Sequence, residues 1–322
     1  MEKFFFEVIV VGSGLSAKTT IVSLFKKGII PFWIENIQNY KINDDRTTML
    51  SPKSFKMFKE LGLKDFEKKS FPTKKINIKT QNQKNFTVFE DKKSLPICYL
   101  TENNVLHQEL DTLISKIEKN KKLVKVKDEI RSIKSDSDNN EIVLKSGDKI
   151  YSSLIIGVDG ANSKIRKIQN IKTKDHGIKK FGLVAIMEHE TSHPNVSWQV
   201  FSETGILALL AKDIKPNKRA VSSLIWSLDK KQIDAIRNLP SKDFEKKVKE
   251  EFGSSLGDLH LISKINEWPI FRIDVPNPTG TRTVLLGDAA HSIYPLAGQG
   301  FNLAIGDILQ ITDTMLWAKE RG

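Results

Sequence analysis

The chain has 322 residues, of which 39% are hydrophobic and 28% charged, a composition typical of a globular protein with one large or two modest domains. No apolar run approaches the roughly 18 residues of a membrane-spanning helix, so we expect no membrane crossing. The formal charge of +12 comes from 43 scattered lysines and only 8 arginines, a pattern that argues against a nucleic-acid partner. A solvated basic surface is the simpler interpretation, and weak attraction to anionic lipid headgroups is the alternative.

The segment from Phe4 to Val11 predicts a strand rather than a secretion signal, because Glu7 interrupts its apolar run and a glycine loop follows. We therefore expect a cytoplasmic protein, with peripheral attachment to the inner face of the membrane as an alternative. The single Cys98 leaves no intramolecular disulfide and no cysteine metal cluster, and we expect it to be a small buried residue.

A dinucleotide-binding pattern follows the first strand. Gly12 and Gly14 precede a helical pattern, a second buried strand is expected over 29–34, and Glu35 comes next. Gly12 is expected to form the tight turn, Gly14 to let the backbone approach a pyrophosphate, and Ala17 to stand in for the third glycine. Glu35 would accept hydrogen bonds from an adenosine ribose. This pattern does not separate FAD from NAD.

Strand and helix patterns alternate through the middle of the chain. Ser51 before Pro52 predicts a helix N-cap, and an amphipathic helix begins near Asn103. Strands are expected over 74–80 and 85–89, as a small sheet, and over 123–126, 130–134, 141–145 and 151–157.

From about residue 176 to 274, alternating strands and an amphipathic helix predict a sheet with helical cover, and its histidines lack metal-ligand spacing. Trp198, Trp226, Trp268 and Phe271 could line an apolar pocket, although core packing is the commoner role of buried aromatic residues.

The most informative stretch lies near the C-terminal end. The apolar run 284–286 predicts a buried strand that ends at Gly287, which places Asp288 at the carboxyl edge of a sheet, where α/β folds bind ligands. The run Gly298-Gln-Gly300 then precedes a helical pattern. Bare backbone N–H groups at this helix start would form a cradle for an anion or a polar ring.

The string Gly287-Asp-Ala-Ala-His, followed by Pro295 and by Ala-Gly-Gln-Gly-Phe-Asn302, resembles the second FAD fingerprint of the aromatic-hydroxylase flavoprotein monooxygenases. It is most similar to the ubiquinone-biosynthesis hydroxylases. The resemblance implies FAD as the cofactor, with Asp288 holding the ribityl chain and the glycine loop beside the flavin. By this resemblance the cofactor contacts, besides Gly12, Gly14, Ala17 and Glu35, come from Arg46, Asn103, Asp159, Gly160, Arg166, Gly287, Asp288, Gly298, Gln299, Gly300 and Asn302, with Pro295 and Gly298 in the loop next to the flavin.

The same resemblance implies an α/β fold. A Rossmann-like FAD-binding domain (1–72, 95–175 and 275–322) would be interleaved with a sheet-rich substrate domain (73–94 and 176–274). The implied reaction hydroxylates an aromatic ring, by analogy a polyprenylated quinone precursor in ubiquinone biosynthesis, with NAD(P)H as electron donor and O2 as co-substrate. Because the cofactor carries this chemistry, no catalytic side chain or metal is required of the protein.

Two alternatives share these motifs. One is an FAD-dependent reductase or dehydrogenase on the same fold. The other is a non-catalytic flavin-binding relative, which could act in an assembly at a membrane surface.

Overall fold

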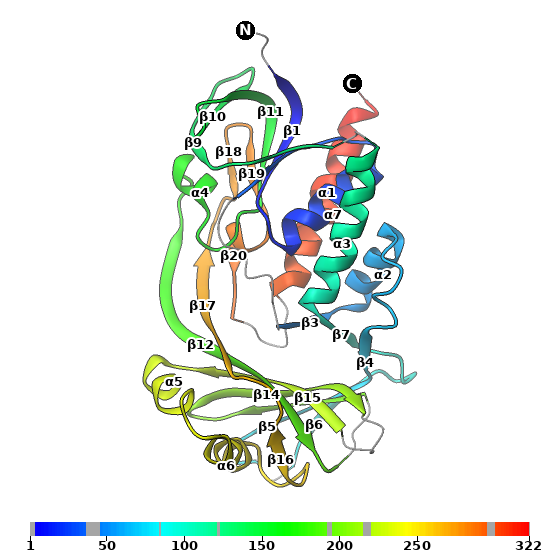
Figure 1. The fold of residues 1–322 in the computed structure, drawn as a ribbon, viewed down its shortest axis with the longest axis vertical. Helices are drawn as coiled ribbons and strands as arrows, with labels where there is room; N and C mark the ends of the chain where they lie inside the picture. The colour runs from blue at the N-terminus through cyan, green and yellow to red at the C-terminus, as the bar shows by residue number, and fades with distance from the viewer. Residues whose placement is uncertain are drawn as a thin grey trace.

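Two large sheets, one above the other in Figure 1, form the frame of the molecule, and the long strands β12 (Lys174–His189) and β17 (Asn266–Asp274) run between their regions. The computed structural model describes residues 4–36, 46–83, 85–120, 123–191, 195–214, 220–294 and 300–321. The α/β fold expected from the sequence is confirmed: one sheet is largely parallel and packed with helices, and the other is largely antiparallel.

The upper, eight-stranded sheet has a parallel centre. Its strand order is β18-β19-β11-β1-β2-β8, with β10 and β9 added beside β11, and β19, β11, β1, β2 and β8 run parallel. Val8 to Val11 in β1 are at most 1% exposed, because both faces of this central strand are covered. The strands are β1 (Phe5–Val11), β2 (Phe32–Glu35), β8 (Val124–Lys127), β9 (Ile130–Ser135), β10 (Asn140–Leu144), β11 (Lys149–Gly157), β18 (Thr279–Gly280) and β19 (Thr283–Leu285).

Helices α1, α3 and α7 lie side by side on one face of this sheet (Figure 1). Their apolar side chains share one core with β1 and α2. Ser51 caps α2 as expected, since its Oγ accepts the N–H of Ser54 at 3.2 Å. The helices are α1 (Leu15–Lys26), α2 (Pro52–Leu61), α3 (Asn103–Lys119), α4 (Lys164–Ile168), α5 (Lys230–Ile236), α6 (Ser241–Phe252), the short 3-10 helix η1 (Gly287–Ala289) and α7 (Gly300–Lys319).

The lower, nine-stranded sheet has the order β20-β17-β12-β15-β14-β13-β5-β6, with β16 paired to β12. Helices α5 and α6 cover it (Figure 1), and Phe244, Val248 and Phe252 of α6 are fully buried in the shared core. The strands not yet given are β5 (Lys75–Thr80), β6 (Thr87–Glu90), β13 (Val196–Phe201), β14 (Gly205–Ile214), β15 (Ala220–Leu228), β16 (Leu259–Leu261) and β20 (His291–Ser292).

Two expectations about strands were wrong in detail. The segments near 74–80 and 85–89 do not form a small sheet of their own: β5 pairs in parallel with β13 and so extends the nine-stranded sheet. The second strand of the dinucleotide unit begins at Phe32 rather than at residue 29, because Pro31 has no N–H to give to a ladder.

A separate three-stranded sheet joins the two large ones. It consists of β3 (Thr47–Leu50), β7 (Cys98–Glu102) and β4 (Ser70–Thr73), in the order β3-β7-β4. Cys98 is buried, as expected, in a small core with Leu210 of the nine-stranded sheet. The segment boundaries of the two expected domains stay a proposal. Within the described part of the chain, no helix combines the length and the apolar character that crossing a bilayer requires.

Candidate functional site

The glycine loop makes a turn that only glycine fits at its first position. Gly12 has φ +147°, and a Cβ there would lie 2.3 Å from the carbonyl oxygen of Val158. Its N–H donates to the carbonyl of Ile34 at 3.1 Å. The Cβ of Ala17 would be only 3.2 Å from a Cβ on residue 12, so the third glycine position also needs a small residue.

The loop leads into helix α1 with its N-terminus open to a ligand. Gly14 is the N-cap, and the described residues provide no side-chain cap and no acidic residue in the first turn. The first N–H groups of a helix lack intrahelical acceptors and carry partial positive charge, which favours an anion.

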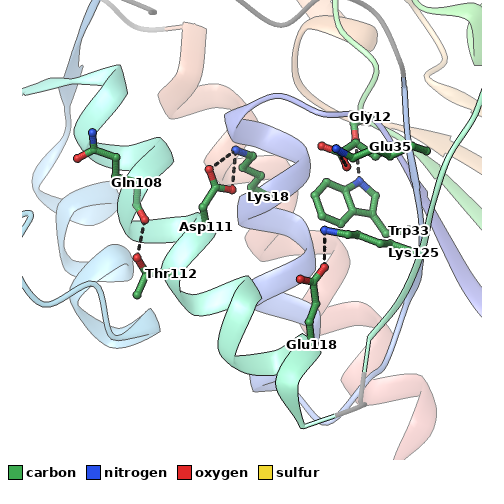
Figure 2. A network of polar contacts seen from close by, with 10 residues as sticks. Gly12, Lys18, Trp33, Glu35, Gln108, Asp111, Thr112, Glu118 and Lys125 are labelled. Carbon is green, nitrogen blue, oxygen red and sulfur yellow. Dashed lines mark hydrogen bonds and ion pairs between the residues drawn. The ribbon is translucent and has the colours of Figure 1, made fainter. Parts of the chain in front are cut away.

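Glu35 ends β2 beside the glycine loop (Figure 2). Its Oε2 atom is buried and accepts no hydrogen bond from the described residues, and Lys127 Nζ lies 3.9 Å away. A buried carboxylate oxygen without a hydrogen bond is costly unless a ligand supplies the donor. Glu35 is therefore well suited to accept from a ribose hydroxyl.

Asp288 lies in η1, directly after the parallel strand β19. Solvent reaches its side chain, yet the surrounding protein desolvates it enough to raise the pKa of the carboxyl, while the positive charges of Arg46 and His291 act to lower it. Asp288 therefore presents a carboxylate to solvent beside the positive charges of Arg46 and His291.

Side chains of helix α7 hold the turn that carries Asp288 in place. Asp307 Oδ2 accepts the backbone N–H of Gly287 at 2.9 Å and also contacts His291 Nε2 at 2.7 Å. Gly287 has φ +57°, and a Cβ there would lie 3.0 Å from the Cβ of Ala304 and 3.4 Å from Ser16 Oγ. The second fingerprint is thus packed against both α7 and the start of α1.

Asp159 and Arg166 stabilise the loop after β11. Asp159 Oδ2 accepts the N–H groups of Lys164 and Ile165, at 2.7 and 3.1 Å, while its Oδ1 is buried without a hydrogen bond from the described residues. Burial raises the pKa of the Asp159 carboxyl, against hydrogen bonds that lower it. Gly160 has φ +82°, which glycine adopts without strain.

Arg166 is buried, and its guanidinium donates to two backbone carbonyls: Nη1 to Ala289 at 2.8 Å and Nη2 to Ala161 at 2.6 Å. Its contact with Ala289 ties this loop to the turn that carries Asp288. Arg166 thus holds two of the predicted motifs together, and its predicted contact with the cofactor stays a prediction.

Both asparagines predicted at the site make hydrogen bonds within the protein, Asn302 to backbone and Asn103 to a side chain. Asn302 donates to the Met49 carbonyl at 2.7 Å and accepts the Ser51 N–H at 2.9 Å, which joins α7 to β3 and α2. Asn103 accepts from Thr48 Oγ1 at 2.7 Å.

Arg46 lies between the two large sheets. The backbone N–H of Asn103 donates to the Arg46 carbonyl at 3.0 Å. The exposed guanidinium lies over the ring of Trp268 in β17, 4.2 Å from its centroid. It also acts electrostatically on Asp288.

Most of the predicted site residues therefore meet at the carboxyl edge of the parallel sheet. Gly300 begins α7, whereas Pro295, Gly298 and Gln299 lie outside the described residues. Of the aromatic residues considered for a pocket, Trp226 is buried in the core of the lower sheet, and Trp198 packs there against Phe86.

Two residues that hold the turn at Asp288, His291 and Asp307, were not predicted from the sequence. His291 lies inside the second fingerprint, but nothing in the sequence showed that its partner would be Asp307.

Comparison with known proteins identifies the family of the chain. The protein family described as "FAD binding domain" matches residues 6–318. The mitochondrial ubiquinone biosynthesis monooxygenase COQ6 of Caenorhabditis elegans is 29% identical over 314 residues, covering 85% of this chain and 68% of that one. The 3-demethoxyubiquinol 3-hydroxylase of Escherichia coli is 26% identical over 325 residues, covering 98% and 81%. The expected similarity to ubiquinone-biosynthesis hydroxylases is confirmed.

Solved structures share the fold at low identity. PqsL of Pseudomonas aeruginosa in complex with 2-aminobenzoylacetate has a TM-score of 0.80 at 15% identity, with coverage of 98% of this chain and 87% of that one. The p-nitrophenol 4-monooxygenase PnpA of Pseudomonas putida has a TM-score of 0.73 at 14% identity, covering 100% and 82%.

Proposed function

The chain belongs to the FAD-binding domain family, and we propose that it is an FAD-dependent monooxygenase that hydroxylates an aromatic, polyprenylated quinone precursor of ubiquinone biosynthesis. NAD(P)H would be the electron donor and O2 the co-substrate. The names of the similar proteins from Caenorhabditis elegans and Escherichia coli support this substrate class.

Three structural features test whether the residues fit FAD. Gly12 forms a turn that a Cβ would block, and this turn leads into α1, whose N-terminus has no side-chain cap from the described residues. Glu35 Oε2 is a buried acceptor without a hydrogen bond from the described residues, at the end of the second strand. Asp288 is a solvent-exposed carboxylate that follows β19, and β11 and β1 lie between β19 and the strand that ends at Glu35. A pyrophosphate, a ribose and a ribityl chain would satisfy these three features, so the residues fit the cofactor.

Within this proposal each group has a defined task. The N–H groups at the start of α1 would bind the pyrophosphate, Glu35 would accept from the adenosine ribose, and Asp288 would accept from ribityl hydroxyls. The charge of Arg46 would favour the ionised form of Asp288, which is the form that accepts hydrogen bonds. FAD, when bound, supplies the redox and oxygen-transfer chemistry, and the protein supplies binding, orientation and exclusion of water.

The crowded yet exposed Asp288 at the carboxyl edge of the parallel sheet is the observation that carries the proposal. Its test begins with the absorption spectrum of the purified protein after incubation with FAD, in which we expect the bands of bound flavin. NAD(P)H oxidation should then be stimulated by a prenylated phenol, and ¹⁸O from ¹⁸O2 should appear in the product. Stimulated oxidation without label in any phenol would favour the reductase alternative, and absence of flavin binding would reject both.

We also propose that the protein associates peripherally with anionic membrane. Val88 and Phe89 on the edge strand β6 and the nearby Leu95 are 48%, 52% and 57% exposed. The residues between Phe89 and Leu95 include the exposed Lys92 and Lys93, and also Asp91 and Glu90, of which Glu90 pairs with Lys75 Nζ at 2.9 Å. Exposed apolar side chains near lysines suit the boundary between anionic headgroups and acyl chains. Co-sedimentation with vesicles that contain phosphatidylglycerol should exceed that with phosphatidylcholine vesicles, and Phe89→Ser should weaken it. Equal sedimentation with both vesicle types would contradict the proposal.

A further inference from the structure

We propose that Trp33 is a positioning residue that orients the glycine loop toward the pyrophosphate of the cofactor, an inference that rests on the proposed FAD site. The indole Nε1 of Trp33 donates to the carbonyl of Gly12 at 2.7 Å (Figure 2). Both groups are buried, and the Trp33 side chain is 2% exposed. A side chain of the second strand thus holds the backbone of the first glycine.

This contact determines the orientation of a peptide plane. The peptide between Gly12 and Ser13 is trans, as are all peptides in the described chain, so the N–H of Ser13 points opposite to the Gly12 carbonyl. Because Trp33 holds that carbonyl toward the helix-covered face of the sheet, the Ser13 N–H is turned away from this core. The N–H of Gly12 is already used by Ile34. The Ser13 N–H is therefore the first loop donor available to an anion at the start of α1.

The indole itself is held on both sides. Trp33 sits in β2 opposite Val10 of β1 and Lys125 of β8. Lys125 Nζ lies 5.3 Å from the indole ring centre and pairs with Glu118 Oε1 of α3 at 2.5 Å (Figure 2). A cation over the ring face, fixed by a carboxylate from a packed helix, opposes rotation of the indole away from Gly12.

Filling the apolar core would not by itself require a side chain with an N–H group at position 33. Phenylalanine would also fill an apolar position in β2, without a polar atom that needs a partner. The chain offers a matched comparison in Trp226 of β15, which is 1% exposed and whose Nε1 makes no hydrogen bond to the described residues. Trp33 and Trp226 are thus equally buried. They differ because the Trp33 indole N–H donates to a backbone carbonyl, whereas that of Trp226 does not.

The test measures binding of two probes to flavin-free protein. FAD and ADP are titrated by calorimetry into the wild-type chain, Trp33→Phe and the control Trp226→Phe. For Trp33→Phe we expect Kd to rise roughly threefold to tenfold for both probes, the range of one net hydrogen bond. ADP carries the pyrophosphate without the flavin, so its Kd should rise by the same factor. For Trp226→Phe we expect a change of less than about twofold.

A second variant keeps the volume of the side chain. β-(3-Benzothienyl)alanine at position 33 replaces the N–H by sulfur in a ring of the same shape, and it should reproduce the loss seen for Trp33→Phe. This variant decides the matter if Trp33→Phe does not fold. Unchanged FAD affinity in the benzothienyl variant overturns the inference, and so does a loss for FAD that ADP does not share. If the wild-type chain binds no FAD, the proposed function fails first.

Discussion

Replacing Asp307 by asparagine tests how the turn that carries Asp288 is held. Asp307 Oδ2 contacts both the Gly287 N–H and His291 Nε2, at 2.9 and 2.7 Å. Asparagine has the same shape and keeps an oxygen for the Gly287 N–H. The substitution therefore removes chiefly the negative charge next to His291.

The size of the effect should depend on pH, and its sign follows from the His291 pKa. The hydrogen bond to Asp307 raises that pKa above the ordinary value of 6.5, helped by the charges of Asp307 and Asp288 and opposed by burial. A group whose pKa is raised on folding stabilises the folded protein fully at pH values below its unfolded-state pKa. This stabilisation is lost as pH rises through its folded-state pKa. Asp307→Asn should thus cost most at pH 6 and least at pH 9.

The magnitude follows from a charged hydrogen bond that is partly open to solvent. Such bonds contribute about 1.5–3 kcal/mol. The two side chains are 30% and 29% exposed, so we expect the lower end. Asp307→Asn should lower the free energy of unfolding by about 1.5 kcal/mol at pH 6 and by less at pH 9, since the stabilisation is lost as pH rises through the folded-state pKa of His291.

Urea unfolding followed by circular dichroism measures both values. The control is the same substitution in a His291→Gln background, where the cost should be equal at the two pH values, as a double-mutant cycle requires. The reasoning is wrong if Asp307→Asn costs the same at pH 6 and pH 9 with His291 present. It is also wrong if the pH dependence survives in the His291→Gln chain.

Three further outcomes follow from the site. Asp288→Ala should weaken FAD binding by about 1.5–3 kcal/mol, roughly ten- to hundredfold in Kd; an unchanged titration of folded protein would remove Asp288 from the site. Gly12→Ala should abolish FAD binding, because its Cβ would meet the Val158 carbonyl. The control is Gly28→Ala, which also has a positive φ (+72°) but open space around it; it should cost about 1–2 kcal/mol of stability and leave binding intact. FAD titrations and thermal melts of both variants measure these effects. Burial raises the pKa of Cys98 to about 11, so a thiol reagent at pH 8 should modify the native protein at least tenfold more slowly than the urea-unfolded chain.

Local pattern was sufficient to predict the dinucleotide unit. A buried strand reads as an unbroken apolar run, and the turn at Gly12 requires a residue without a Cβ, so sequence and geometry coincide there. The helix cap at Ser51 also follows from short-range chemistry, since Ser51 Oγ accepts the backbone N–H of Ser54.

Long-range pairing could not be predicted in the same way. Strand β5 pairs with β13 more than a hundred residues away, and an alternating pattern does not say which partner a strand will find. The resemblance predicted a cofactor contact for Arg166, but it did not predict that its guanidinium would also donate to the backbone carbonyls of Ala161 and Ala289. Trp33 looked like one more apolar strand residue, because a sequence does not reveal where an indole N–H points.

Helix α7 explains why motifs so far apart in the chain act on one surface. Asn302, near its start, binds the backbone at Met49 and Ser51, and Asp307, less than two turns later, binds the turn at Gly287. Ala304, between them, packs where any side chain at residue 287 would stand. The position of Asp288 therefore depends on the packing of α7 against the N-terminal part of the chain. By linkage, a ligand that binds Asp288 only in the folded arrangement must also stabilise α7 in its place.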